Sequence, residues 1–249
     1  MNVLLSIITI NKDNAKGLEA TFKSALPKQR VKDLQYIVID GNSSDLSDKI
    51  IAENKTKLSK VVIEDDLGIF DAMNKGLKYA TGKYVLFLNS GDTLCNKVDA
   101  LMDAIRSSRG IDVFYSDIAI KGRRAIPINY SPFLLLYHCL NHQNMIINRS
   151  CLASGYDLKY NYSADVKWQI DNLARLSLKK LSEPISFFDL GGVSSKKERH
   201  IVEKIWRERW IAHYTSKVHS RPKKTIAIII TSIIYVIKLT VPNFLSKSQ

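Results

Sequence analysis

The stretch that decides the fold is residues 64–92, which read EDDLGIFDAMNKGLKYATGKYVLFLNSGD. An acidic turn leads into an amphipathic segment, Ile69–Ala80, which is typical of a helix. The apolar run Lys83–Leu88 follows and ends abruptly in Asn89-Ser90-Gly91-Asp92. Open α/β sheets bind ligands at the carboxyl ends of their strands. We therefore expect Asp92 at a ligand-binding edge, where a carboxylate oxygen suits Mg²⁺ or Mn²⁺ holding a diphosphate.

The same alternation of short apolar runs and amphipathic segments extends along the first half of the chain. Short β-branched runs indicate buried parallel strands, and apolar residues at helical spacing indicate helices. Further strands are predicted at Val3–Ile10, Leu34–Ile39, Lys60–Ile63 and Asp112–Ser116, and further helices at Lys12–Ala25, Val98–Ser107 and Ala164–Leu176. This order predicts an α/β fold, with a mostly parallel sheet and helices on both faces.

The positive charge of the chain is concentrated near its C-terminus. Residues 196–249 hold twelve Lys and Arg against three Glu, a net charge of +9, whereas residues 1–195 hold 25 basic and 21 acidic residues. A basic tail beside an apolar run points to an anionic membrane surface. Nucleic acid is the least favoured partner, because Thr225–Ile237 carries no charge with which to follow phosphates.

The C-terminal segment is predicted to be helical and to associate with a membrane. Glu198–Tyr214 is a basic helix with Trp206 and Trp210, and the uncharged run Thr225–Ile237 follows. This run is shorter than the roughly 20 apolar residues of a transmembrane helix. A monotopic or re-entrant helix anchored by Trp, Lys and Arg fits better. The alternatives are a buried helix or one packed on a partner subunit. We expect two parts, residues 1–195 and a basic helical tail at 196–249.

Motifs at the ends of the first strands carry a resemblance to a known family. The motifs are Ser6-Ile7-Ile8-Thr9-Ile10-Asn11, Asp40-Gly41-Asn42-Ser43-Ser44-Asp45, Asp66, and Met73-Asn74-Lys75-Gly76. With residues 64–92, they resemble the family-two, GT-A-type nucleotide-sugar glycosyltransferases. The stretches Gly68–Gly76 and Leu88–Asp92 are similar to those of the colanic-acid-type subgroup that builds bacterial surface polysaccharides. The resemblance implies a GT-A-like fold and nucleotide-sugar contacts by Thr9, Asn11, Asp40, Asp66, Asn74 and Gly76.

Two positions depart from the family pattern. Met73 replaces the usual arginine, and Asn89 stands where the metal-binding turn often has an acid, so Asp92 is left as the metal ligand. One carboxylate, two diphosphate oxygens and waters can still complete an octahedral site. Read without the family, Asp40 is a common turn residue before glycine.

The resemblance also assigns residues on the acceptor side. Asp165, in Tyr162-Ser163-Ala164-Asp165, is the candidate general base that takes the proton of the attacking hydroxyl. Read without the family, Asp165 is a residue that caps the N-terminus of the helix. His142-Gln143 and the loop around Gly191 and Gly192 are weaker candidates for contacts to the acceptor or to the donor diphosphate.

The resemblance implies an inverting, metal-dependent glycosyltransferase. The expected donor is a UDP-, GDP- or dTDP-linked sugar, and the expected acceptor is a lipid-linked glycan at the cytoplasmic face of the inner membrane of a bacterium. The alternative is a catalytically inactive nucleotide-sugar-binding or scaffold subunit, which Met73 and Asn89 would allow. A nucleotidyltransferase is disfavoured, because no glycine-rich phosphate loop follows the first strand.

Overall fold

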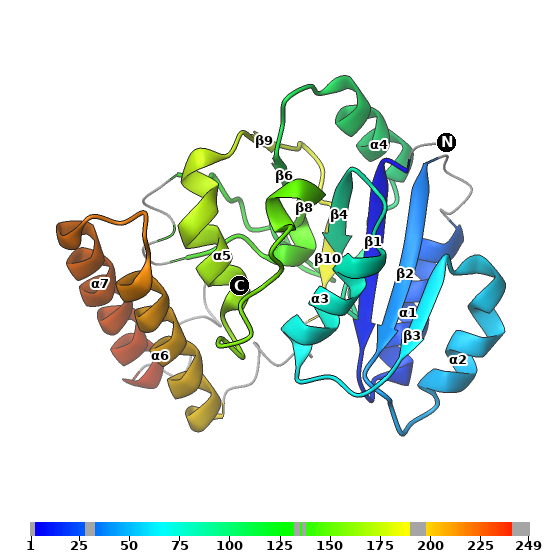
Figure 1. The fold of residues 1–249 in the computed structure, drawn as a ribbon, viewed down its shortest axis with the longest axis horizontal. Helices are drawn as coiled ribbons and strands as arrows, with labels where there is room; N and C mark the ends of the chain where they lie inside the picture. The colour runs from blue at the N-terminus through cyan, green and yellow to red at the C-terminus, as the bar shows by residue number, and fades with distance from the viewer. Residues whose placement is uncertain (1–2, 28–32, 132–134, 136–137, 190–197, 241–249) are drawn as a thin grey trace.

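The computed structural model describes residues 3–27, 33–131, 135, 138–189 and 198–240, and within this part a seven-stranded sheet forms the centre of the molecule (Figure 1). Its spatial order is β3-β2-β1-β4-β8-β6-β9. The strands span Lys60–Ile63 (β3), Leu34–Asp40 (β2), Leu5–Asn11 (β1), Tyr84–Phe87 (β4), Met145–Asn148 (β8), Val113–Tyr115 (β6) and Leu178–Lys180 (β9). The α/β class with a mainly parallel sheet is confirmed.

The first four strands are parallel, and their register places polar residues side by side. β1 pairs with β2 and with β4, and Asn11 at the end of β1 lies opposite Asp40 at the end of β2. Every residue of β1 is buried. The β-branched runs therefore lie in the middle of the sheet, and the polar residues that end them share one edge.

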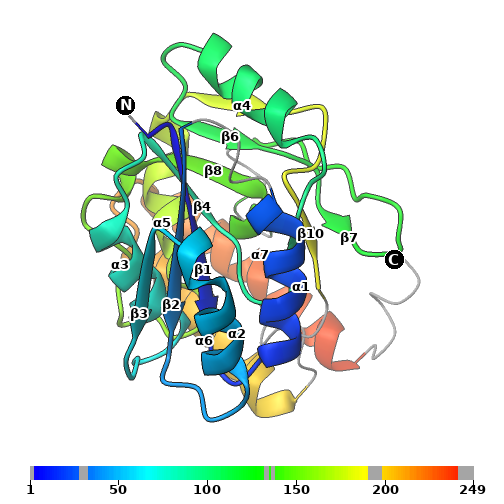
Figure 2. The ribbon, with the colours of Figure 1, turned by 90° about the vertical axis from the view of Figure 1, so that its right-hand side faces the viewer.

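Helices cover both faces of the sheet, as predicted (Figures 1 and 2). The sheet separates two hydrophobic cores, and alternate residues of β1 point into each, with Ile7 on one face and Ile8 on the other. The face of Ile7 is covered by α1 (Ala15–Ala25), α2 (Ser47–Asn54) and α4 (Val98–Ser107). The face of Ile8 is covered by α3 (Ile69–Tyr79) and α5 (Ala164–Asn172).

The second half of the fold departs from the parallel pattern. β8 lies antiparallel between β4 and β6. A second sheet joins β5 (Thr93–Leu94), β10 (Ser186–Phe188) and β7 (Ala119–Ile120). Four short 3₁₀ helices complete the described elements: η2 (Lys55–Lys57), η4 (His142–Asn144), η5 (Arg149–Leu152) and η6 (Leu173–Arg175). The second sheet brings the chain after residue 185 beside the turn that follows β4.

The C-terminal residues form two helices, α6 (Arg199–Thr215) and α7 (Arg221–Thr240), on the side of the molecule opposite β3 and α2 (Figure 1). α6 packs on α5, and α7 packs on α6. Trp206 is buried, and the rings of Trp206 and Trp210 contact that of Tyr235. The expectation of two tryptophan membrane anchors is thus not met by Trp206, because α7 covers its ring.

No helix among the described residues is both long enough and apolar enough to cross a membrane. The expected boundary between the two parts of the chain, at residue 195, lies outside the described residues.

Candidate active site

The turn Asn89–Asp92 at the end of β4 is held by helix α1. The Thr21 hydroxyl donates to the backbone carbonyl of Asp92 at 2.7 Å and accepts the backbone N–H of Gly91 at 2.9 Å. Asn14, which caps α1, donates from Nδ2 to the backbone carbonyl of Ser90 at 3.0 Å. The turn is therefore fixed before any ligand binds, and glycine suits its third position, where φ is +106°.

Asp92 is buried in this turn, with 3% of its surface exposed. Its Oδ1 accepts the backbone N–H of Asp189 at 2.8 Å, and Gln143 also hydrogen bonds to its carboxylate. Burial raises the pKa of Asp92 to about 6, and the donated hydrogen bonds oppose part of that increase. Asp92 thus holds the turn to β10 as well as carrying the carboxylate that the sequence predicts for a metal.

The side chains at the turn can hold a metal ion together with a bound diphosphate, but they cannot enclose a metal ion by themselves. Within the described part of the chain, no three His, Cys, Asp or Glu side chains are grouped to hold a metal ion. A second carboxylate lies beside the turn, because a Cβ on Gly91 would be 3.3 Å from Oδ2 of Asp189. Mg²⁺ is commonly bound by one or two carboxylates together with substrate phosphates and water. The residues fit an ion that arrives with a diphosphate, and they do not form a complete protein cage.

Asn11 and Asp40 form a buried pair at the ends of β1 and β2. Asn11 donates from Nδ2 to Oδ2 of Asp40 at 2.7 Å, and the backbone N–H of Ser43 donates to Oδ1 of Asp40 at 2.7 Å. Both carboxylate oxygens therefore order the turn after β2. Oδ1 of Asn11 is buried and has no partner in the described structure. Asn11 retains one acceptor at this edge.

Asp66 lies against the same turn. A Cβ on Gly41 would be only 2.3 Å from Oδ2 of Asp66, so the approach of the carboxylate requires glycine at position 41. Lys12 donates from Nζ to the carbonyl of Gly41 at 2.7 Å and to that of Asn42 at 2.9 Å. The structure brings Asn11, Asp40 and Asp66 to one edge of the sheet. A nucleotide contact by these residues stays a prediction.

Three other predicted nucleotide contacts have packing explanations. Thr9 is fully buried, and its hydroxyl pairs with that of Tyr36 at 2.7 Å. The Asn74 amide makes two hydrogen bonds to the backbone of Tyr156, at 2.7 and 2.9 Å. A Cβ on Gly76 would be 2.4 Å from Cγ2 of Ile8, so this glycine lets α3 approach β1 closely. A nucleotide contact at these positions stays a prediction.

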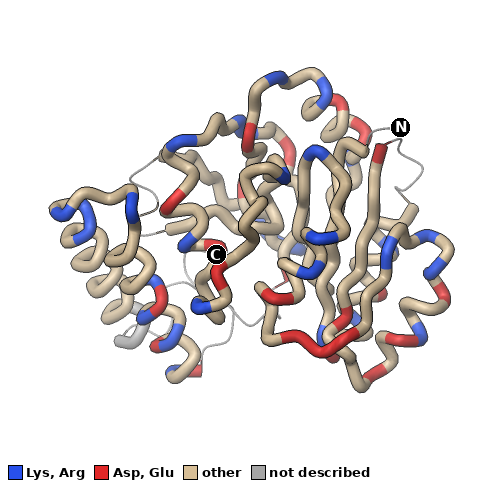
Figure 3. Tube along the Cα trace, in the orientation of Figure 1, with Lys and Arg blue, Asp and Glu red and all other residues tan. Residues whose placement is uncertain are grey.

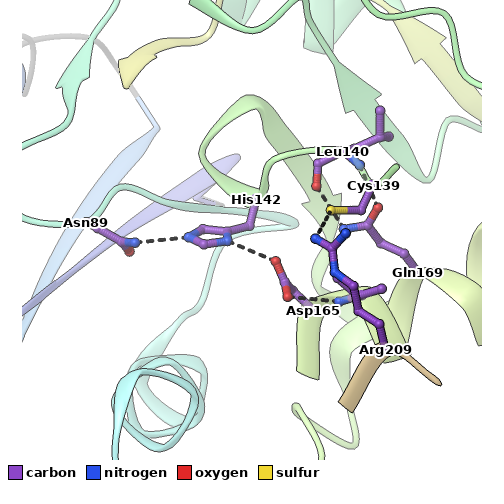
Figure 4. Close-up of polar contacts among 8 residues, drawn as sticks. Asn89, Cys139, Leu140, His142, Asp165, Gln169 and Arg209 are labelled. Carbon is purple, nitrogen blue, oxygen red and sulfur yellow. Dashed lines mark hydrogen bonds and ion pairs between the residues drawn. The ribbon is translucent and has the colours of Figure 1, made fainter. Parts of the chain in front are cut away.

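His142 connects the turn after β4 with the candidate base (Figure 4). Its Nε2 lies 3.0 Å from Nδ2 of Asn89, and its Nδ1 lies 3.2 Å from Oδ2 of Asp165. Asp165 is in the first turn of α5, and its Oδ1 accepts the backbone N–H of Val166 at 2.8 Å. His142 and Gln143, weak candidates in the sequence, therefore contact the two parts of the site.

Sequence reasoning missed several residues that support the site, including Thr21, Asp189 and Glu208. Glu208 of α6 accepts the backbone N–H groups of Asn161 and Tyr162 at 2.9 and 2.8 Å, and so holds the loop before α5. A glutamate on an exposed-looking basic helix gives no local signal for this long-range contact. Gly191 and Gly192 lie outside the described residues.

Comparison with known proteins agrees with this architecture. Residues 6–110 match the Glycosyl transferase family 2 domain. An uncharacterised glycosyltransferase of Mycobacterium tuberculosis is 28% identical over 211 residues, which cover 78% of each chain. Staphylococcus aureus TarS 1–349, solved with UDP-GlcNAc, has a TM-score of 0.68 and 16% identity over 96% of this chain and 76% of its own. The Pyrobaculum calidifontis mannosyltransferase PcManGT, solved with GDP-Man and Mn²⁺, has a TM-score of 0.62 and 14% identity over 95% and 75%.

The fold and the domain match together define a glycosyltransferase. Residues 6–110 match a family 2 glycosyltransferase domain, and the fold of the chain is GT-A-like. The narrower likeness to colanic-acid-type enzymes stays a prediction.

Proposed function

We propose that this protein transfers a sugar from a nucleoside diphosphate sugar to a lipid-linked glycan, with inversion at the anomeric carbon, during bacterial surface polysaccharide synthesis. The observation that carries the proposal is the hydrogen-bonded connection from Asn89 through His142 to Asp165. It links the edge where open α/β sheets bind nucleotides to a carboxylate at a helix start. Donor and acceptor would therefore meet at this connection.

The nucleoside would bind at the edge formed by Asn11, Asp40 and Asp66. The unpartnered Oδ1 of Asn11 is an acceptor for an N–H or hydroxyl group of a base or ribose. Asp66 offers a carboxylate at the same turn, and Asp40 keeps the turn in shape. The solved neighbours with UDP-GlcNAc and GDP-Man support a nucleotide-sugar donor, and the donor of this chain is open among UDP-, GDP- and dTDP-linked sugars.

The diphosphate would lie at the turn after β4 with a divalent cation. Asp92 and the neighbouring Asp189 are the carboxylates that would hold Mg²⁺ or Mn²⁺ there, and the Mn²⁺ in PcManGT supports a metal. When bound, the ion would neutralise charge on the leaving diphosphate. Asp92 must be ionised for this role.

Asp165 would act as the general base. Its carboxylate removes the proton of an acceptor hydroxyl while the hydroxyl oxygen attacks the anomeric carbon and the bond to the diphosphate oxygen breaks. The nucleoside diphosphate leaves with the electron pair of that bond. A single displacement of this kind inverts the anomeric centre.

The lipid-linked acceptor and the membrane contact rest on the C-terminal hairpin. One face of α7 exposes Ile226, Ile229, Ile233 and Val236, each at least half exposed and all at helical spacing. Arg221, Lys223 and Lys224 stand at the start of the same helix, and further Lys and Arg lie along the neighbouring helix α6 (Figure 3). An apolar face with basic flanks fits the surface of an anionic membrane. We therefore place the enzyme at the cytoplasmic face of the inner membrane.

The experiment that tests the donor assignment is a calorimetric binding screen of purified protein against UDP, GDP, dTDP and their sugars, with and without Mn²⁺ or Mg²⁺. We expect metal-dependent binding of one nucleoside diphosphate, lost in Asp92→Ala and retained in the exposed control Asp99→Ala. Binding without any sugar transfer would instead favour the inactive scaffold. Folded protein that binds none of the nucleotides would contradict the proposed function.

A further inference from the structure

His142 is held between two side chains that come from different parts of the fold. The side chains of His142 and Asp165 are 12% and 14% exposed, so their contact is largely shielded from water. Asn89 contacts the other ring nitrogen from the end of β4 (Figure 4). Both ring nitrogens are therefore engaged within the protein.

The two partners select one form of the neutral ring. The Asn89 Nδ2 group can only donate, so Nε2 of His142 must accept. The ring proton then resides on Nδ1, which faces Oδ2 of Asp165 at 3.2 Å. A neutral imidazole thus satisfies both contacts and donates its single hydrogen bond to the carboxylate.

The carboxylate of Asp165 is held at both oxygens. Oδ1 accepts the backbone N–H of Val166, and Oδ2 faces Nδ1 of His142. Each carboxylate oxygen has further lone pairs with which to accept a hydroxyl proton. Two fixed donors therefore set the direction of the carboxylate without using all of its acceptor capacity.

The backbone around His142 is fastened to the helix that carries Asp165. Gln169 of α5 is fully buried, and its amide pairs with both the N–H and the carbonyl of Leu140 at 2.9 Å each (Figure 4). On the other side, the Ser186 hydroxyl donates to the carbonyl of Gln143 at 2.7 Å. The spacing between the ring and the carboxylate is thus fixed by the fold.

We propose that His142 is a positioning residue that fixes the Asp165 carboxylate, and that Asn89 fixes the tautomer of His142. The proposal rests on Asp165 being the general base. It gives the asparagine at position 89 a function of its own. An acid at this position would accept from Nε2–H, so that the two carboxylates would compete for the single ring proton.

The first test is the tautomer, which needs no substrate. In protein labelled with ¹⁵N at histidine, we expect His142 to carry its proton on Nδ1, with Nε2 unprotonated. The signal is assigned by its loss in His142→Gln. Asn89→Asp should shift the ring towards the doubly protonated form, whereas Asn89→Ser, which also keeps a donor, should not. A wild-type ring with its proton on Nε2 alone would overturn the proposal.

The second test uses donor hydrolysis, with water as the acceptor and UDP-GlcNAc or GDP-mannose as the probe. We expect His142→Phe to lower kcat about 10- to 100-fold with donor KM unchanged within about twofold, a loss typical of supporting residues. His142→Gln, which keeps an N–H donor, should recover part of kcat. Equal loss in both variants, or a loss confined to KM, would contradict positioning.

The two tests separate this inference from the proposed function. If Asp165→Asn hydrolyses the donors as fast as wild type, the assignment of the base fails, and positioning fails with it. If Asp165→Asn is inactive and the two His142 variants match wild type, only the positioning inference fails. If the wild type hydrolyses neither donor, the tautomer of His142 alone decides whether the positioning inference stands.

Discussion

The backbone N–H of Asp189 donates to Oδ1 of Asp92 at 2.8 Å, although 97 positions separate the two residues. This bond closes the end of β10 onto the turn after β4 and covers the carboxylate that we propose as a metal ligand. The burial of this carboxylate raises the pKa of Asp92 to about 6, from its ordinary value of 3.8. One interaction therefore couples the shape of the turn to its protonation.

The first prediction concerns stability and pH in the absence of metal and donor. Because the pKa of Asp92 is raised in the folded state, the native protein binds more protons than the unfolded chain between about pH 4 and 6. The free energy of unfolding should fall as pH rises through that window, by at most about 3 kcal/mol, and then stay level with respect to Asp92. Asp92→Asn should lose this dependence.

Urea unfolding at several pH values measures the effect. The quantity of interest is the difference between the wild-type and Asp92→Asn curves, because other groups titrate in both proteins. Asp99→Asn, an exposed residue of α4, serves as the control and should follow the wild type. Parallel curves for wild type and Asp92→Asn would show that Asp92 has an ordinary pKa.

The second prediction is that Asp165→Asn abolishes catalysis while donor binding survives. General base catalysis is typically worth about 10²- to 10⁴-fold, so kcat for release of UDP or GDP should fall by that factor. The donor Kd should change less than about twofold, since the proposed nucleotide-binding edge lies at the ends of β1 and β2. Asp157→Asn, an exposed acid in the preceding loop, is the matched control. Calorimetry and nucleotide release measure the two quantities.

The elements that local pattern determines were predictable from sequence. The helix expected at Val98–Ser107 and the strand expected at Lys60–Ile63 have the observed bounds. Their signals are apolar spacing and β-branched composition, which depend on neighbours along the chain. The family resemblance implied that Asp40 and Asp66 contact the same nucleotide, and the structure places both at the turn after β2.

The antiparallel strand β8 and the partners of Asp165 were not predictable in this way. β8 is defined by pairing with β4 and β6, and its four residues carry no period that specifies direction. The contacts of His142 with Asn89 and Asp165 span 53 and 23 residues of sequence. Such contacts depend on tertiary packing. The sequence shows that polar residues are present at these positions, but it does not show which of them contact one another.

The third prediction tests the link between α6 and the base. Glu208 receives two backbone N–H groups from the loop before α5, so Glu208→Ala should leave both donors without their partner. We expect a loss of about 1–3 kcal/mol in the free energy of unfolding, because hydrogen bonds to charged groups are the stronger ones. kcat should fall while donor Kd stays constant, since the loop leads into Asp165.

Glu203→Ala is the control for Glu208→Ala, because Glu203 lies on the same helix and pairs with Arg199 at the surface. Exposed ion pairs contribute about 0–1 kcal/mol, so this variant should resemble the wild type in stability and in kcat. Equal behaviour of the two variants would remove Glu208 from the support of the site.

The last prediction concerns the exposed face of α7. Ile229 and Ile233 are 53% and 54% exposed, and Arg221, Lys223 and Lys224 begin the same helix. Burying one such side chain in a membrane contributes about 1.5–3 kcal/mol, and this gain is reduced because part of each side chain is already buried in the fold. The double variant Ile229→Ser/Ile233→Ser should therefore weaken vesicle binding at least about tenfold. Leu46→Ser, which alters an even more exposed apolar residue on the other side of the molecule, should have no effect. Sedimentation with vesicles of phosphatidylglycerol and phosphatidylcholine measures the difference.

Binding should need the anionic lipid and weaken with salt, because basic residues supply the attraction. Equal binding to pure phosphatidylcholine, or unchanged binding of the double variant, would show that α7 is covered by something other than an anionic membrane.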